Sequence, residues 1–197
     1  HDGTGNVTVS FESDESLASA SVSLDTPTAP TTLTPTTGDG SAPYTYNATY
    51  DGADGDYTAT LDTAADAADN DGASGQSNTT TVDTTPPTFS AASPAGATVT
   101  TDQPEITVNV SDATRGVNAS SIAVTVTDAN GGDGDEFDAA TKNATGVSYD
   151  GTTITVNATK AGVSLSEGGA TVTVDATDNA NNGNTTTFSF TVDTVSP

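Results

Sequence analysis

Residues 81–87 of this chain, TVDTTPP, return as residues 191–197, TVDTVSP, at a distance of 110 residues. Each copy follows a run that is typical of a β-strand and ends in proline, which restricts the backbone of a linker. Solenoid repeats have periods of about 20–50 residues, so a period this long indicates tandem domains instead. We therefore expect one domain at residues 1–83, a second at residues 84–193 and the start of a further linker at residues 194–197.

Strict alternation of apolar and polar residues predicts half-buried strands in both domains. In the second domain, Asp150-Gly151 marks a tight hairpin turn, and a short strand is expected near Thr98-Val99. The clearest alternating runs of this domain lie at residues 105–110, 121–128, 146–156, 170–176 and 187–192. About seven short strands without a convincing helix, in about 110 residues, predict an all-β fold, a β-sandwich of the immunoglobulin type.

The first domain repeats this order of strands with a gap at its start. The run at residues 7–11 matches the run at residues 105–110, but nothing before Asn6 matches residues 88–104. The sequence therefore predicts a sandwich that lacks its first strand, which leaves an unpaired sheet edge and an open groove. Two explanations stay open, a cut from a longer chain and a strand supplied by another subunit, and we favour the cut. Residues 25–40, rich in Thr and Pro, are interpreted as a long loop or an edge segment.

The chain carries 27 acidic and 3 basic side chains, for a net charge of −24. Nucleic acid binding needs a basic surface and anionic membranes repel an acidic one, so neither partner is expected. No apolar run approaches the about 20 residues of a membrane-spanning helix, so any anchor or export signal is expected outside this sequence. The acidic side chains are spread over the loops, where their self-repulsion destabilises the compact state in low salt.

Catalysis is not expected from this composition. The only histidine is His1, at a terminus, and serine has neither a histidine nor a suitably placed lysine to activate it. A carboxylate pair can hydrolyse a glycoside, but the absence of tryptophan leaves no obvious platform for a sugar. Because the chain also has no cysteine, disulfides and thiolate metal sites are excluded.

Three acidic segments of the second domain are expected at one pole of the sandwich. There the loop after the second strand, the loop before the last strand and the incoming linker meet, and they carry Asp112, Asp178-Asn179 and Asp83. Ca²⁺ takes six to eight oxygen ligands from carboxylates, amides and backbone carbonyls. The sequence therefore predicts a calcium site at the domain junction, and a merely hydrated acidic surface is the alternative. A weaker counterpart in the first domain consists of Asp14, Asp69 and Asp71.

These motifs are similar to those of the prokaryotic Ig-like, big-type repeats of large surface proteins and adhesins. The resemblance rests on the VDTTPP string, residues 110–117, residues 175–180 and the Phe-rich strand that ends at Val192-Asp193-Thr194. It covers the second domain throughout and the first from about Asn6 onward. The resemblance implies a rod of domains stiffened by calcium at their junctions, here through Asp83, Asp112 and Asp178. The usual Asn-Ala-Gly-Asn string carries one extra residue in this chain, at residues 179–183.

The amino-acid usage, poor in lysine and rich in Asp and Thr, resembles that of haloarchaeal proteins, and an ordinary acidic secreted domain is the alternative. Resemblance to haloarchaeal surface glycoproteins implies that some Asn-X-Ser/Thr sequons carry glycans. The candidate positions are Asn6, Asn47, Asn78, Asn109, Asn118, Asn143, Asn157 and Asn184.

We interpret the chain as a non-enzymatic extracellular module, a stalk, S-layer or adhesin segment of a halophilic archaeon. Its expected partners are neighbouring Ig-like domains or subunits of the same protein, together with cell-surface glycans or proteins. One alternative is the subunit of a surface filament or pilus, in which a neighbour donates the strand that completes the first sandwich. Another alternative is a spacer domain attached to a secreted halophilic enzyme.

Overall fold

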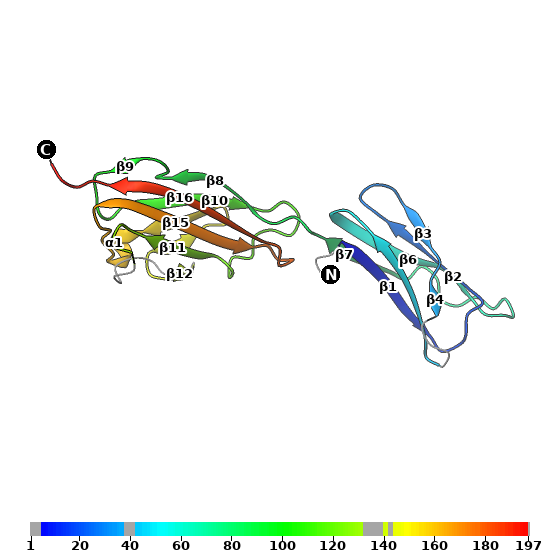
Figure 1. The fold of residues 1–197 in the computed structure, drawn as a ribbon. Coiled ribbons are helices and arrows are strands. Elements are labelled where there is room, and N and C mark those ends of the chain that lie inside the picture. The colour runs from blue at the N-terminus through cyan, green and yellow to red at the C-terminus, as the bar shows by residue number, and fades with distance from the viewer. Residues whose placement is uncertain (1–4, 38–41, 132–139, 142–143, 197) are drawn as a thin grey trace. The chain divides into compact units, whose positions relative to one another are not determined.

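The computed structural model describes residues 5–37, 42–131, 140–141 and 144–196 (Figure 1). Of the residues that the structure describes, 54% lie in strands and 2% in helices, so the predicted all-β class is confirmed. The chain divides into two compact units, His1–Thr85 and Pro86–Pro197, and each unit has its own pair of sheets.

The second unit is a β-sandwich. One sheet contains β8 (Thr88–Ser93), β10 (Glu105–Ser111), β13 (Val147–Tyr149) and β14 (Thr153–Asn157). The other sheet contains β9 (Thr98–Val99), β11 (Ala123–Thr127), β12 (Ala140–Thr141), β15 (Gly168–Thr177) and β16 (Gly183–Val192). The strand orders are β13-β14-β10-β8 and β12-β11-β15-β16-β9. Neighbours pair antiparallel except β9, which runs parallel to β16, so this short strand belongs to the sheet opposite β8.

The core of the second unit lies between the inner faces of these sheets. In β10 the alternating residues Ile106, Val108 and Val110 are each at most 2% exposed. They pack in one cluster with apolar residues of the opposite sheet, among them Val172 and Phe190. Full burial of such a side chain contributes about 1.5–3 kcal/mol, so this cluster is the main source of stability of the unit.

One turn of helix, α1 (Ala158–Ala161), follows β14, although the sequence analysis expects no helix. Its start is capped by Asn157, whose side chain accepts a hydrogen bond from the Lys160 amide at 2.8 Å. Its end is Gly162, which has a left-handed φ of 73°. The element was missed because a single turn has no apolar periodicity, and only its two caps mark it.

The first unit is a smaller sandwich. One sheet contains β1 (Asn6–Ser13), β4 (Thr36–Thr37) and β5 (Tyr44–Asp51), and the other contains β2 (Ser19–Asp25), β3 (Thr31–Leu33), β6 (Gly55–Ala65) and β7 (Ser77–Val82). The strand orders are β4-β5-β1 and β3-β2-β6-β7. Its main cluster of buried apolar side chains comprises Val7, Leu24, Tyr57 and Val82, so the core is smaller than that of the second unit.

The two units correspond strand for strand, with two exceptions. The first sheet β4-β5-β1 matches β13-β14-β10, and the second sheet β3-β2-β6-β7 matches β12-β11-β15-β16. Within the described residues, nothing in the first unit corresponds to β8 or β9. The prediction that the first sandwich lacks its first strand is therefore confirmed for this part of the chain. Of residues 25–40, interpreted as a loop or an edge segment, the described part up to residue 37 contains two edge strands, since β3 pairs with β2 and β4 pairs with β5, on the sides away from β1 and β7. Residues 38–40 lie outside the described residues.

A buried tyrosine fixes the approach to β6. Tyr57 is 2% exposed, and its hydroxyl donates a hydrogen bond to the Ala53 carbonyl at 2.7 Å. This is the tyrosine corner of immunoglobulin-like sandwiches. Gly52 makes the corner possible, because a Cβ at this position would overlap the Tyr57 hydroxyl. Burial raises the pKa of this hydroxyl above its ordinary value of 10.0 and keeps it protonated as a donor.

Candidate metal centre

The loop after β15 is organised by the carboxylate of Asp178. Its Oδ1 accepts hydrogen bonds from the amides of Ala180 at 2.7 Å and Asn182 at 2.9 Å. Its Oδ2 accepts from the Asn182 side chain at 2.7 Å. Asn181 adopts a left-handed φ of 71°, which Asn tolerates better than most residues. The loop therefore closes tightly around a carboxylate that is completely buried.

The loop after β10 is organised in a similar way by Asp112. Oδ1 of this carboxylate accepts hydrogen bonds from the amides of Thr114 at 3.2 Å, Arg115 at 3.0 Å and Gly116 at 2.8 Å. Gly116 has a left-handed φ of 73°, and this conformation lets the chain turn back beneath the carboxylate. Asp112 is half-buried, with its side chain held by its own loop.

Asn179 ties these two loops together. Its Nδ2 donates to the carbonyls of Arg115 at 2.8 Å and Gly116 at 3.0 Å, and its backbone amide donates to Gly116 as well. A β-bridge between Val117 and Asp178 adds a second link. The predicted role of Asn179 as a metal ligand stays a prediction, since its amide nitrogen already serves as a bridge between the loops.

Asp83 lies in the connecting segment, which we define as residues 83–87. Its side chain is completely buried. Oδ1 accepts a hydrogen bond from the Thr85 amide at 3.2 Å, whereas Oδ2 is buried and accepts none. At the end of the segment, Pro87 is buried, and its carbonyl accepts a hydrogen bond from the Asn184 side chain at 2.8 Å.

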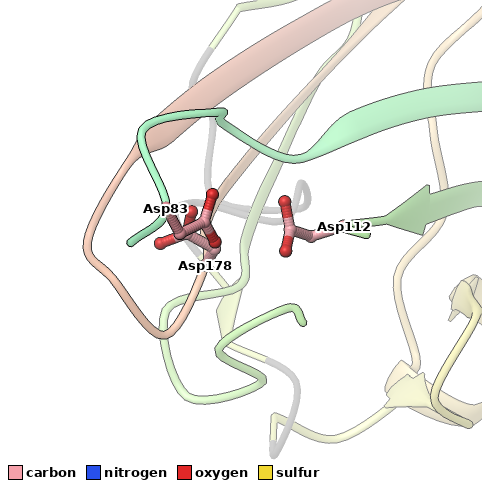
Figure 2. Close-up of side chains that lie close together, drawn as sticks. All are labelled: Asp83, Asp112 and Asp178. Atoms are coloured by element: carbon pink, nitrogen blue, oxygen red, sulfur yellow. The ribbon is translucent and has the colours of Figure 1, made fainter. Parts of the chain in front are cut away.

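Asp83, Asp112 and Asp178 form the three-carboxylate cluster (Figure 2). Each offers one carboxylate oxygen, and the three oxygens lie within 4.8 Å of one another. Like charges this close repel strongly where water is excluded, and removing a carboxylate from water costs several kcal/mol. A hard divalent cation is the chemistry that such a donor set fits, because it neutralises the charges and prefers oxygen.

The weaker metal site predicted at the first-unit pole stays a prediction. Asp14, Asp69 and Asp71 are exposed and, within the described residues, are not part of a comparable group. The loop after β6 is instead organised by Asp66, whose carboxylate accepts hydrogen bonds from the Ala68 amide and from the amide and side chain of Asn70. These bonds, led by the one from the Asn70 side chain, lower the pKa of Asp66 below its ordinary value. Asp66 is the counterpart of Asp178, and the shared spacing Asp-X-Ala-X-Asn is the sequence signal that identifies it.

A second acid in each unit holds the segment that follows its last strand, and the sequence analysis missed both. Asp54 accepts hydrogen bonds from the Thr84 amide and hydroxyl, both at 2.8 Å, and from the Thr85 hydroxyl at 2.5 Å. The bond from Thr85 contributes most to lowering the pKa of Asp54. In the second unit, Glu167 accepts hydrogen bonds from the amide and the hydroxyl of Thr194. Each acid immediately precedes the glycine that begins β6 or β15.

The candidate glycosylation sites differ in exposure. Four are exposed: Asn6, Asn47, Asn78 and Asn184. Three are half-buried and carry structural hydrogen bonds: Asn109, Asn118 and Asn157. Asn143 lies outside the described residues. Exposure alone therefore favours the first four as glycan acceptors, although the Asn184 side chain also holds Pro87.

No family model matches the sequence, and no curated protein matches it. Solved structures of similar fold include a tetra-tandem repeat of the extending region of a large adhesion protein, at 22% identity and a TM-score of 0.37, covering 98% of this chain and 47% of that one. A second similar structure is a Ca²⁺-stabilised adhesin with which an Antarctic bacterium binds ice. Its sequence identity is 22% and its TM-score 0.37, and the match covers 98% of this chain and 45% of that one.

The two immunoglobulin domains of DIP-gamma give 13% identity and a TM-score of 0.44, with coverages of 96% and 90%. This chain thus spans less than half the length of each solved adhesin chain and most of the solved two-domain chain of DIP-gamma. These similarities concern the fold alone. The ligand and the partner of this chain have to be inferred from its own residues. Among the described residues, no helix has the length and apolar character needed to cross a bilayer.

Proposed function

We propose that this chain is a non-enzymatic structural or adhesive module of an extracellular surface protein, stiffened by calcium. The three-carboxylate cluster is the observation that carries the proposal. Asp83 is the last residue before the threonines of the connecting segment, and Asp112 and Asp178 belong to two loops of the second unit. A cation held by all three carboxylates fastens the connecting segment to those loops.

The cluster favours a bound cation over a bare acidic surface because of its burial. Asp83 and Asp178 are both 0% exposed, whereas acidic residues of a merely hydrated surface stay in water. Ca²⁺ supplies positive charge and accepts six to eight oxygens. Asp83, Asp112 and Asp178 would hold it, and backbone carbonyls or water would complete the shell. This assignment excludes Asp66, which has the same loop as Asp178 but belongs to no group of three carboxylates in the described structure.

A stiff connection suits a module that projects from a cell surface. Pro86 and Pro87 fix two backbone angles of the connecting segment. Asp54 already holds Thr84 and Thr85 against the first unit. A cation at Asp83 would add a further restraint on the connecting segment, so the two units would sample fewer relative orientations. Partners of such a module are neighbouring domains or subunits of the same protein, and surface glycans or proteins at its binding end.

The net charge of −24 supports the further proposal of a halophilic, haloarchaeal source. At 0.1 M salt, charges interact over about 10 Å, and at 1 M over about 3 Å, so molar salt removes most of the self-repulsion. The exposed sequons at Asn6, Asn47 and Asn78 agree with a glycosylated outer surface. Repetition of the linker sequence after the second unit agrees with a stalk or S-layer segment built from further similar units.

Calcium titration by calorimetry in constant high salt tests this function. Wild type and Asp66→Asn should bind one Ca²⁺, and Asp178→Asn should lose binding. Asp66→Asn is a matched control, because it removes the same charge from the same type of loop without touching the three-carboxylate cluster. At a calcium concentration one hundred times Kd, the free energy of unfolding should rise by about 2.7 kcal/mol.

Small-angle scattering should report a narrower range of shapes when calcium is added to the wild type, and no change for Asp178→Asn. Absence of binding at millimolar calcium, or equal binding by Asp178→Asn and wild type, would show that the cluster is only a buried acidic group.

A further inference from the structure

The first unit has two sheet edges that the second unit covers. Within the described residues, β1 and β7 are the terminal strands of their sheets. Their counterparts in the second unit, β10 and β16, are followed by β8 and β9. Backbone amides and carbonyls along an uncovered edge are ready to pair with another strand.

A groove runs between these two edges. Two adjoining hollows of about 660 and about 600 Å³ share the residues Val9, Ser10, Ala59 and Asn78, so they form one continuous groove. Residues of β1 line one side, and residues of β6 and β7 line the other. Among the described residues that line it, only Glu12 and Asp14, at one end, are charged, which is unusual in so acidic a chain.

Register shows which side chains of the groove are smaller than their counterparts in the second unit. The pairing of β6 with β7 and of β15 with β16 places Asn78 and Thr80 where the second unit has Phe188 and Phe190. Likewise Ala59 stands where the second unit has Val172. The smaller side chains leave the groove partly unfilled, so an occupant has to supply its own apolar bulk.

The second unit shows what kind of segment fills this position. There β8 and β9 place Phe89, Ala92 and Val99 against the core. β8 pairs antiparallel with β10, and after a bend β9 pairs parallel with β16. Residues 84–101 carry no charged side chain, although the chain as a whole has 27 acidic residues. An uncharged segment avoids both repulsion from the acidic surface and the cost of burying a charge.

From this internal comparison, we propose that the groove of the first unit is an acceptor site for an extended strand that the described residues of this unit do not supply. The strand is extended and uncharged, with an aromatic residue in its first half and small apolar residues around a bend, as in residues 88–99. Its backbone adds to the edges of β1 and β7, and its apolar side chains fill the groove. This site lies within the first unit and does not depend on calcium at the three-carboxylate cluster.

The internal comparison also predicts the register of the incoming strand. In the second unit, Phe89 lies opposite Val110. Alignment of the alternating runs Val7-Val9-Phe11 and Ile106-Val108-Val110 in the sequence gives Phe11 as the counterpart of Val110 in β1. The incoming aromatic residue should therefore lie beside Phe11, whose ring already stacks on Tyr46 with a centroid distance of 5.3 Å. In the same way Val99 lies opposite Val192, the counterpart of Val82, so the end of the strand should reach the last residue of β7.

A synthetic peptide with the sequence of residues 84–101 tests the proposal on the whole chain in high salt. Fluorescence anisotropy of the labelled peptide should show saturable binding of one peptide per chain. Hydrogen exchange should slow in β1 and β7 and stay unchanged in β10 and β16. A control peptide with Phe89→Asp and Val99→Asp should bind at least about tenfold more weakly, because it loses two buried apolar side chains.

Protein variants locate the site independently. Ala59→Glu places a charge in the part of the groove shared by both hollows and should abolish binding, whereas Thr49→Glu adds the same charge to an exposed position of β5 and should not.

Four results would overturn the proposal: no saturable binding at millimolar peptide, equal binding of the control peptide, slow exchange at β1 and β7 without any peptide, or slowed exchange in β10 and β16 instead. Slow exchange without peptide would mean that residues of the chain itself close the groove, or that two copies pair through these edges. Sedimentation would tell these two cases apart.

Discussion

Asp66 and Asp178 hold the same turn in the two units through the same three hydrogen bonds, yet only Asp178 is completely buried. The turn is therefore a property of the local sequence, Asp-X-Ala-X-Asn, and needs no neighbour. The second carboxylate also differs in having the carboxylates of Asp83 and Asp112, which lie outside the turn, within 4.8 Å. Both carboxylates therefore organise their own turn, but only Asp178 belongs to a group of carboxylates that could hold a cation.

Calcium should slow hydrogen exchange in the connecting segment and should not slow it in the repeat of this segment at residues 193–197. The Thr85 amide donates to Asp83 at 3.2 Å, and the Val195 amide donates to the exposed Asp193 at 3.3 Å. If Asp83 holds a cation, calcium should slow hydrogen exchange at Thr85 and leave Val195 unchanged. Exchange measured by NMR with calcium and with a chelator checks this. Equal responses at both amides would point to a general effect of ionic strength.

Stability should increase strongly with salt. A net charge of −24 makes the folded chain repel itself, and screening over about 3 Å at 1 M removes most of that repulsion. The melting temperature should therefore rise between about 0.1 M and 2 M KCl at neutral pH. Sodium chloride should act similarly, since screening depends on ionic strength. A flat melting temperature over this range would remove the physical basis for a halophilic source.

The hydrogen bonds of Asp54 predict a loss of stability in acid. Its folded-state pKa lies below the ordinary value of 3.8, chiefly because the Thr85 hydroxyl donates to it. The carboxylate therefore stabilises the folded state above pH 3.8, and this contribution disappears as the pH falls through the lowered pKa. Asp54→Asn should flatten this part of the pH profile. Asp25→Asn, at an exposed position of β2, is the control, and equal profiles for both variants would contradict the assignment.

The tyrosine corner should contribute measurably to the first unit. Tyr57→Phe keeps the buried ring and loses the hydrogen bond to Ala53, which should cost about 1 kcal/mol. Gly52→Ala should cost more, because its Cβ overlaps the Tyr57 hydroxyl and forces the ring or the loop to move. Gly169→Ala is a control, since a Cβ there meets nothing within 4 Å. Urea unfolding of the three variants measures the differences.

Thermal unfolding should show two transitions, with the first unit melting first. Its main buried cluster has four apolar residues, whereas the cluster of the second unit extends over both of its sheets. Hydrogen exchange during heating assigns each transition to its strands. A peptide that fills the groove should raise only the lower transition, by mass action. A single cooperative transition would show that the two units support each other more than their separate cores suggest.

Much of the fold was predictable, because period-2 alternation is a local signal that survives folding. The alternation in the sequence predicts one face of a strand for Ile106, Val108 and Val110. The structure buries these three side chains together. Convergence of Asp83, Asp112 and Asp178 was also predictable, since the topology of the sandwich sends the linker and both loops to one pole. What they bind stays a proposal.

Other features depended on tertiary geometry. In the first unit Asp66 holds the loop, although Asp69 and Asp71 looked equivalent in sequence, because only Asp66 stands at the position that the backbone amides of the turn surround. Asn179 is placed by its contact with the loop after β10, some sixty residues earlier. The hydrogen bonds that Thr84 and Thr85 donate to Asp54 likewise join residues that no local sequence pattern relates.

The sequence by itself determined the all-β class, the repeat and the lack of a counterpart of β8 among the described residues of the first unit, because alternation, spacing and composition are properties of neighbouring residues. Tertiary structure alone decided which carboxylates are buried together and that the missing strand leaves a groove rather than a collapsed edge. Both depend on packing between sheets: Asn78 and Thr80 are too small and polar to fill the space that Phe188 and Phe190 occupy in the second unit.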